Sequence, residues 1–407
     1  MTPDRRRARP AWPLLLALGA VPGLAAPAAA QVEPTLSTAI RVPMQRFVDE
    51  GEVAGAVTLV GNANGVQSLL AVGRRDIEDD LPMRPDTLFR IASMTKPITA
   101  VAIMILVDEG KLAVDDPVEK HLPEFRGQML AWTRSGDSPV TKRPARPITL
   151  RDLLTHTSGL PDAAPAGSAE RDAPPPKTLA EASQHYARRP LSFEPGSRWA
   201  YSNAGINTLG RAVEVASGMP YEAFLKARIF DPLGMVDTTF YPTPDQIKRA
   251  AVTYAREGGK LRPVESSREA PTPGDRPPSP AGGLYSTAPD LARLYRLMLN
   301  RGESDGKRIL SQSAVAEMTR LRTGDLEAGF VPGMGFGLGW GFVKAPGGVT
   351  EALSPGSYGH GGAFGTQAWI DPTRGRYAIL MIQRVGLANN DATPMRRELQ
   401  RAAFEKP

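Results

Sequence analysis

The sequence predicts an α+β fold, in which strands from both ends of the chain build one sheet and the middle forms a helical lobe. Apolar runs typical of strands occur at residues 54–60 and 66–72. Such runs return at residues 337–343, 365–370 and 377–382, and the segment between carries apolar residues at helical spacing. We therefore expect a cleft between two lobes, where binding sites are usually found. The expected α/β lobe covers about residues 31–105 and 336–407, and the expected helical lobe about residues 106–335.

The first expected elements are a helix and a β-hairpin. Residues 35–50 carry apolar side chains at helical spacing and stop at Gly51. The two early strand runs are separated by turn-forming residues at positions 62–65. Residues 88–92 then have the composition of a strand end, and an apolar helix is expected to follow directly and to end at Gly110.

Threonine and serine residues typical of helix N-caps occur at several positions in the middle of the chain. Thr149, Thr287 and Ser311 each precede a segment with helical spacing. The helices predicted here cover residues 150–157, 204–217, 221–230, 287–300 and a segment after Ser311.

Two proline-rich segments interrupt this helical middle, at residues 161–177 and 262–282. Such low-complexity composition is typical of loops. We expect the first segment to form a mobile surface loop or a lid over the cleft.

The N-terminus has the composition of a secretory signal peptide. Four arginines between Arg5 and Arg9 precede an apolar stretch at residues 12–24, and a run of alanines ends at Ala30. We expect residues 1–30 to be cleaved near Ala30, by the general or the twin-arginine route, and the remaining chain to be periplasmic or secreted. Because the other apolar runs are too short to span a bilayer, we expect no stable membrane insertion.

Charge and composition exclude several function classes. The leader accounts for +3 of the formal net charge of +6, and acidic and basic residues are interspersed in the rest, so nucleic-acid binding is not expected. The chain has no cysteine, which excludes disulfides and thiolate chemistry. The four histidines show no HxH or HExxH spacing, so neither a metal nor a cofactor is expected.

Ser93 and Lys96 stand at the start of the apolar helix. Residues three apart on a helix share a face, so the lysine amine is within reach of the serine hydroxyl. A serine hydroxyl needs an adjacent base, and a buried lysine with a depressed pKa can serve as one. A second SxxK match, from Ser304 to Lys307, lies in a polar loop with no apolar helix behind it.

Two further motifs supply complementary groups. Tyr201 and Asn203 precede a predicted helix; a tyrosine beside a lysine ammonium can have a lowered pKa and transfer protons. A glycine-rich segment that includes His360 precedes a predicted strand, and the N–H of Ala363 can join that of Ser93 in an oxyanion hole. The alternative to these functional roles is a structural one, in which Tyr201 packs under a turn and the glycines form an ordinary turn before a strand.

Together these motifs resemble those of class C serine β-lactamases, the related D,D-peptidases and the family VIII esterases. The resemblance covers SMTK, YSN and HGG and extends through LLTHTSGLP, FEPGSRWAYSNAG, DPLGM and GGLYSTAPDLARL, nearly the whole chain after the leader. It implies a β-lactamase/transpeptidase-like fold, with an antiparallel sheet flanked by helices and a second, all-helical lobe.

The resemblance also implies a role for each motif residue. Ser93 is the acylated nucleophile, and Lys96 and Tyr201 share the proton transfers. The substrate and its oxyanion are held by Asn203, His360, Gly361, Gly362 and Ala363.

The third motif departs from the Lys-Thr-Gly of most β-lactamases and penicillin-binding proteins, because His360 stands in place of the lysine. A neutral imidazole loses a charge-assisted bond to a substrate carboxylate, worth about 1.5–3 kcal/mol. The expected substrates are therefore small carboxylic esters, with weaker β-lactam or amide hydrolysis. Arg384 or a lid arginine can restore a cation, which keeps β-lactams as an alternative.

Other functions remain compatible with the sequence. Within the enzyme class they are a β-lactamase, a D,D-carboxypeptidase and an acyltransferase, which share the acylation step. Outside that class, the alternative is a penicillin-recognising protein that acylates without turnover. A Ser-His-Asp hydrolase built on the GxSxG match around Ser304 lacks the strand-turn-helix context that this motif requires.

Overall fold

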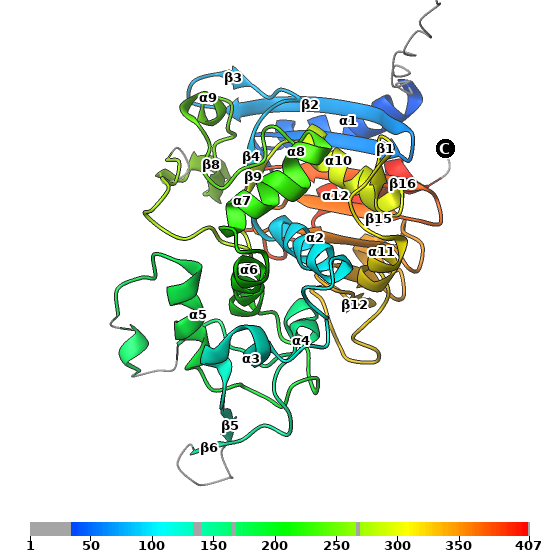
Figure 1. Ribbon diagram of the computed structural model, residues 1–407. Coiled ribbons are helices and arrows are strands. Elements are labelled where there is room, and N and C mark those ends of the chain that lie inside the picture. Colours follow the sequence, from blue (N-terminus) through cyan, green and yellow to red (C-terminus); the bar gives the residue numbers. More distant parts are fainter. Residues whose placement is uncertain (1–33, 133–139, 165–167, 172, 266–268, 406–407) are drawn as a thin grey trace, which may run out of the picture. The chain divides into compact units, whose positions relative to one another are not determined.

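An eight-stranded antiparallel sheet joins the two ends of the described chain (Figure 1). The computed structural model describes residues 34–132, 140–164, 168–171, 173–265 and 269–405, all within one compact unit. The expected leader, residues 1–30, lies outside the described residues. In spatial order the strands are β12 (Met334–Phe336), β13 (Gly341–Val343), β14 (Tyr358–Gly361), β15 (Gln367–Asp371), β16 (Arg376–Met381), β1 (Gly55–Asn62), β2 (Gly65–Asp76) and β3 (Leu81–Pro82).

The pairing of β1 with β16 confirms that one sheet is assembled from both ends of the chain. Val57 lies opposite Met381 and Leu59 opposite Ile379, in antiparallel register. These side chains enter one apolar cluster, whereas the alternate residues, such as Val60, enter a second cluster on the opposite face. Both faces of the sheet are therefore buried, as the apolar composition of β1 and β16 requires.

Helices cover both faces of the sheet (Figure 1). On one face α1 (Pro34–Asp49) packs against α12 (Pro394–Phe404). On the other, α10 (Ala288–Leu299) packs against β1 and β16. Helix α10 thus covers the sheet although it lies within residues 106–335; the limits expected for the helical lobe stay a prediction.

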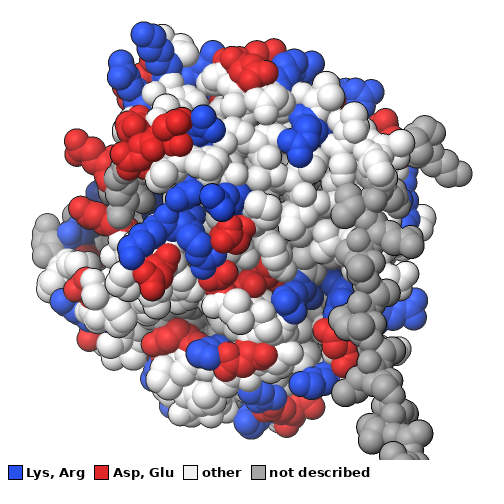
Figure 2. All heavy atoms as spheres, turned by 90° about the horizontal axis from the view of Figure 1, so that it is seen from above, with Lys and Arg blue, Asp and Glu red and all other residues white. Residues whose placement is uncertain are grey.

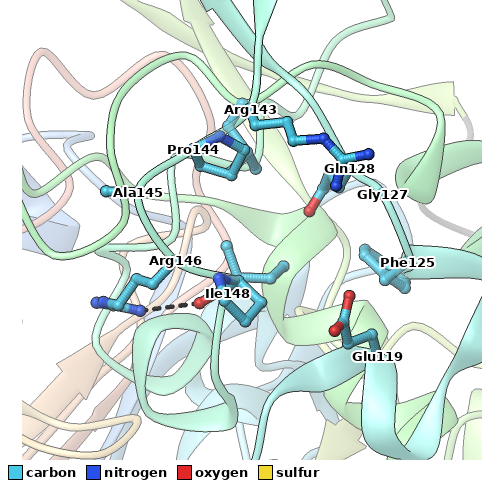
Figure 3. A pocket seen from close by; sticks show the side chains of 11 residues that line it. Glu119, Phe125, Gly127, Gln128, Arg143, Pro144, Ala145, Arg146 and Ile148 are labelled. Carbon is cyan, nitrogen blue, oxygen red and sulfur yellow. Dashed lines mark hydrogen bonds between the residues drawn. The ribbon is translucent and has the colours of Figure 1, made fainter.

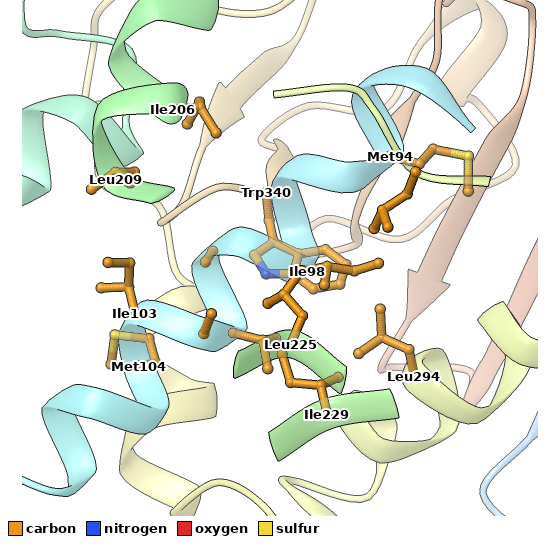
Figure 4. Packing of buried hydrophobic residues seen from close by; sticks show 14 of the residues in the cluster. Met94, Ile98, Ile103, Met104, Ile206, Leu209, Leu225, Ile229, Leu294 and Trp340 are labelled. Carbon is orange, nitrogen blue, oxygen red and sulfur yellow. The ribbon is translucent and has the colours of Figure 1, made fainter. Parts of the chain in front are cut away.

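Helix α2 (Thr95–Asp108) lies between the sheet and the helical lobe. Every residue from Thr95 to Leu106 is buried, which is typical of a helix that is apolar on all sides. Figure 4 shows Ile98 of this helix among Trp340, Leu225 and Leu294, which come from separate parts of the chain. The segment that carries the SMTK motif is thus fixed by packing from both lobes.

The helical lobe surrounds α6 (Asn203–Ser217). This helix contacts α2, α3 (Val118–His121), α4 (Leu150–Leu154), α5 (Leu179–Ala187) and α7 (Tyr221–Leu225). Thr149 caps α4 with a capping box, and Thr287 and Ser311 cap α10 and α11, which confirms the three predicted N-caps. Other helices in the described residues include a π-helix (Lys226–Phe230), α8 (Asp231–Leu233), α9 (Pro244–Ile247) and α11 (Gln312–Met318).

Several local predictions were wrong. The strand expected at residues 88–92 is only β4 (Phe89–Arg90), which pairs with β9 (Tyr285–Ser286) outside the main sheet. His360 lies within β14 rather than in a turn before a strand. The middle of the chain also contains short hairpins: β5 (Leu130–Trp132) with β6 (Val140–Lys142), β7 (Tyr254–Glu257) with β8 (Lys260–Pro263), and β10 (Glu303–Ser304) with β11 (Lys307–Arg308).

Arg189 ties the described part of segment 161–177 to the body of the protein. Its guanidinium donates to the carbonyl oxygens of Pro161, at 3.0 Å, and Asp162, at 2.6 Å, and also pairs with Glu170. Residues 165–167 and 172 lie outside the described residues. Whether the segment acts as a lid stays a prediction.

The surface carries charges of both signs. On the face shown in Figure 2, acidic and basic side chains lie next to one another. Among the described helices, none combines the length and the apolar character needed to cross a membrane.

Candidate active site

Ser93 stands on a short 3₁₀ helix (Ala92–Met94) directly before α2. Ala92 has a φ of 45°, a left-handed conformation that non-glycine residues rarely adopt. The hydroxyl of Thr95 donates to the Ala92 carbonyl oxygen at 2.7 Å and holds this turn. Backbone strain next to a reactive residue is a recurrent feature of functional sites, and here it sets the position of Ser93 at a cavity.

Lys96 places its amine against three oxygens. Its Nζ lies 3.1 Å from Ser93 Oγ, 2.8 Å from Asn203 Oδ1 and 2.7 Å from the carbonyl oxygen of Ala281. Amide and carbonyl oxygens only accept, so the two hydrogens of a neutral amine are used by Asn203 and Ala281. The lone pair of that amine then faces the Ser93 hydroxyl, which is the arrangement a general base requires.

Burial lowers the pKa of Lys96 to about 7, while the carboxylate of Asp162 acts in the opposite direction. The side chain has no exposed surface, and its Nζ lies 4.4 Å from the centre of the Tyr201 ring. The depressed pKa that the sequence predicted for Lys96 is therefore present. A substantial fraction of this amine is neutral at pH 7.

Tyr201 differs from the prediction of a lowered pKa. Burial raises the pKa of this phenol well above 10, although a hydrogen bond with Ser93 opposes the shift. The ring packs against His156, at 4.5 Å between centroids, and Phe330, at 5.0 Å, which reduces its contact with water. Tyr201 is thus a protonated donor to the Ser93 oxygen, because desolvation outweighs the cation nearby.

Asp162 orients Asn203, and sequence reasoning missed it. The Asn203 amide nitrogen donates to the Asp162 carboxylate at 2.8 Å, and so does the backbone N–H of Ala204, also at 2.8 Å. With its nitrogen held on this side, Asn203 must present its amide oxygen to Lys96. Asp162 directly follows the LLTHTSGLP stretch, but it was assigned to the proline-rich loop, and composition gave no other signal.

His156 was also missed. It has a φ of 60°, is almost fully buried, and accepts a hydrogen bond from the Ser202 backbone N–H at 3.1 Å. Burial and the charge of Lys96 lower its pKa well below 6.5. The His156 ring that packs against Tyr201 is therefore neutral.

His360 carries no positive charge at neutral pH. Burial, with a contribution from Lys96, lowers its pKa to about 4. Its Nδ1 lies 2.7 Å from the Gly361 carbonyl oxygen, which can only accept, so the proton of the neutral ring resides on Nδ1. At the third motif this protein therefore has an uncharged imidazole ring. Most of the β-lactamases and penicillin-binding proteins that the motifs resemble have a lysine ammonium there.

The backbone around Gly362 approaches the turn before Ser93 closely. A Cβ at Gly362 would lie 2.5 Å from the carbonyl oxygen of Ile91, so only glycine fits. Ala363 and Ser93 line the same cavity, and among the described residues neither backbone N–H has an acceptor. Two free donors beside the predicted nucleophile match the requirement of an oxyanion hole.

Ser93 opens into a cavity of about 330 Å³. The cavity is lined mainly by the proline-rich loop, by the residues before β9 and by the 3₁₀ helix. A second cavity, of about 200 Å³, lies in the helical lobe between Glu119, Gln128 and Arg143 (Figure 3). None of the motif residues lines this second cavity.

Two sequence-based alternatives receive no geometric support. Arg384 is buried and donates to the Glu52 carbonyl oxygen, so it does not line the Ser93 cavity. The partners of Ser304 are Arg296 and Asp305, and its neighbour Lys307 is exposed on β11. Within the described part of the chain, no group of three acidic or histidine side chains has a geometry that suits a metal ion.

Comparison with known proteins places this geometry in a family. Residues 43–402 match the Beta-lactamase family. Esterase EstB of Burkholderia gladioli is 32% identical over 393 residues, which span 87% of this chain and 94% of EstB. The D-alanyl-D-alanine-carboxypeptidase/endopeptidase AmpH of Escherichia coli K12 is 31% identical over 307 residues, which span 74% of this chain and 71% of AmpH.

Among solved structures, EstCE1, described as a hydrolase with promiscuous acyltransferase activity, superposes with a TM-score of 0.74. The identity is 25%, and the match covers 91% of this chain and 98% of EstCE1. The fold and these relatives define a serine hydrolase. The chain belongs to the β-lactamase family.

Proposed function

We propose that this serine hydrolase is exported and cleaves small carboxylic esters through an acyl-enzyme on Ser93. The observation that carries the proposal is the position of the Lys96 amine, whose Nζ lies 3.1 Å from Ser93 Oγ and also contacts the acceptor oxygens of Asn203 and Ala281. Export is supported by the leader composition of residues 1–30.

Acylation begins when the Ser93 proton moves to Lys96 Nζ and the serine oxygen attacks the ester carbonyl carbon. The backbone N–H groups of Ser93 and Ala363 hold the resulting oxyanion. When the oxyanion collapses, the carbon–oxygen bond to the alcohol breaks, and that alcohol takes a proton from Lys96 through Tyr201. Water then repeats the sequence on the acyl-enzyme and releases the acid.

Esters are favoured over β-lactams and D-alanyl peptides by the neutral state of His360. The name of EstB supports an esterase, whereas the description of EstCE1 supports a hydrolase with acyltransferase activity. The name of AmpH supports a carboxypeptidase as the alternative. A penicillin-recognising protein that acylates without turnover is the alternative outside the enzyme class.

The test compares turnover of a short-chain nitrophenyl ester with that of a chromogenic cephalosporin, using residues 31–407. Ser93→Ala is the blank, and Ser304→Ala is the matched serine control. We expect a ratio far above one, lost in Ser93→Ala and kept in Ser304→Ala. A ratio below one would favour a β-lactamase, a lasting adduct on Ser93 without turnover would favour the binding protein, and activity in Ser93→Ala would refute the site.

A further inference from the structure

We propose that Thr99 and Asn207 are positioning residues, which hold the chain around Ala281 so that its carbonyl oxygen stays on the Lys96 amine. This inference rests on the proposed function, in which Lys96 is the base, and extends it to two side chains that do not line the cavity at the nucleophile. Lys96 Nζ donates to the Ala281 oxygen at 2.7 Å, the shortest of its three contacts. The position of this carbonyl therefore helps to set the position of the base.

The peptide unit between Pro280 and Ala281 is bonded to a side chain at each end. The hydroxyl of Thr99 donates to the Pro280 carbonyl oxygen at 2.8 Å. The N–H of Ala281 donates to Asn207 Oδ1 at 3.0 Å. Because a peptide unit is planar, bonds to its oxygen and to its nitrogen together fix its orientation. The carbonyl that follows, on Ala281, is thereby directed at Lys96.

The single hydroxyl proton of Thr99 has a defined direction. The Pro280 carbonyl oxygen, at 2.8 Å, is nearer to Thr99 Oγ1 than the Thr95 carbonyl oxygen, at 3.4 Å. The hydroxyl of Tyr221 lies 2.6 Å from Thr99 Oγ1, and both side chains are fully buried. Since Thr99 donates to Pro280, Tyr221 must donate to Thr99. The Tyr221 bond therefore favours the orientation in which Thr99 holds the loop.

The two positioning residues come from neighbouring helices, α2 and α6 (Figure 1). On α2, Thr99 lies three residues after Lys96 and so shares its face. On α6, Gly210 lies three residues after Asn207 and contacts the same loop. A Cβ at Gly210 would lie 2.2 Å from Cγ of Pro280, so the missing side chain lets the loop approach the helix. Each helix thus directs two adjacent positions at this segment.

Loss of this support should change the ionisation of Lys96 as well as its position. A charged donor makes a stronger hydrogen bond than a neutral one, so the Ala281 oxygen stabilises the ammonium more than the amine. A displaced carbonyl would therefore lower the Lys96 pKa below its value of about 7. The other titratable side chains near Lys96 are the same in all the variants below, namely Asp162, His156, Tyr201 and His360.

The experiment measures turnover of a neutral short-chain nitrophenyl ester by the purified protein across pH. Thr99→Val removes the hydroxyl and keeps the branched shape, whereas Thr99→Ser keeps the hydroxyl. Asn207→Leu removes the acceptor of the Ala281 N–H; because Asn207 is only half-buried, this variant keeps the test valid if Thr99→Val fails to fold. Thr208→Val is the matched control, since this buried hydroxyl donates within α6, to the Ala204 carbonyl oxygen at 2.8 Å.

We expect kcat to fall by about 10- to 100-fold in Thr99→Val and in Asn207→Leu, as for a catalytic group displaced by about 1 Å. KM should change little, because neither side chain lines the cavity. The acidic limb of the pH–rate profile should move to lower pH in both variants. Thr99→Ser should recover most of the rate, and Thr208→Val should retain it.

A wild-type kcat in either Thr99→Val or Asn207→Leu, or an equal fall in Thr208→Val, would overturn the positioning role. So would a lower rate with an unmoved acidic limb, because loss of folded protein lowers the rate without changing that limb. Turnover by wild type that is lost in Ser93→Ala would leave the proposed function standing in each of these cases. Full activity in Ser93→Ala would instead refute the proposed function itself.

Discussion

The buried amine of Lys96 should make the stability of this protein depend on pH in a defined window. Burial lowers its pKa from 10.5 to about 7. Between these values the unfolded chain binds a proton at this site and the folded chain does not, so the free energy of unfolding rises with pH. The difference between 10.5 and about 7, at about 1.36 kcal/mol for each pKa unit, corresponds to roughly 5 kcal/mol.

Lys96→Met removes the titration while filling similar space. The measurement is urea unfolding of both proteins at several pH values from 6 to 10.5, followed by subtraction of the two free energies. Groups whose pKa does not depend on Lys96 titrate alike in both proteins and cancel. We expect the free energy of unfolding of wild type, relative to that of Lys96→Met, to rise by about 5 kcal/mol between about pH 7 and pH 10.5. Below about pH 7 this difference should be constant. A difference that is flat throughout would show that Lys96 is protonated in the folded protein, and the base mechanism would be refuted.

Three substitutions test the remaining parts of the site. Tyr201→Phe removes the hydroxyl next to Ser93, so kcat/KM for a neutral ester should fall by about 10²- to 10⁴-fold. Asp162→Asn removes the charge that raises the Lys96 pKa, so the acidic limb of the pH–rate profile should move below about pH 7. Gly362→Ala should lower kcat by about 10²-fold, because the new methyl group displaces the oxyanion donor of Ala363.

Urea unfolding is the control for all three substitutions. Unchanged midpoints of urea unfolding would show that losses of rate do not reflect unfolding. Near wild-type rates in Tyr201→Phe would assign all proton transfer to Lys96. An acidic limb that moves upward in Asp162→Asn would contradict the electrostatic role of this carboxylate.

The sequence predicted the parts of the fold that depend on periodic burial. Strands β1 and β16 alternate between two apolar clusters, and this alternation is visible as continuous apolar runs. It did not predict α12, whose buried face includes Arg396 and Gln400, so that polar residues obscure the apolar period. The strand at residues 88–92 was overestimated because the left-handed turn at Ala92 has no compositional signature.

For the site, the motifs identified the side chains but not their ionisation. The lowered pKa of Lys96 followed from its expected burial. The pKa of Tyr201 was predicted to be lowered, whereas burial raises it. The nearby cation was apparent from the motifs, but the rings of His156 and Phe330 that desolvate the phenol come from distant segments. Asp162 was missed for the same reason, since only tertiary structure brings it to the Ser93 site.

The pairing of β1 with β16 also has a consequence for how the chain folds. Val57 cannot find its neighbour until Met381 has been synthesised, and closing so long a loop carries an entropic cost before any contact repays it. Contacts of this sequence separation are associated with slow folding. Until then, β1 of a nascent chain has an unpaired apolar edge, the kind of surface that promotes aggregation. The hydrolase therefore depends on some of its last residues to protect one of its first strands.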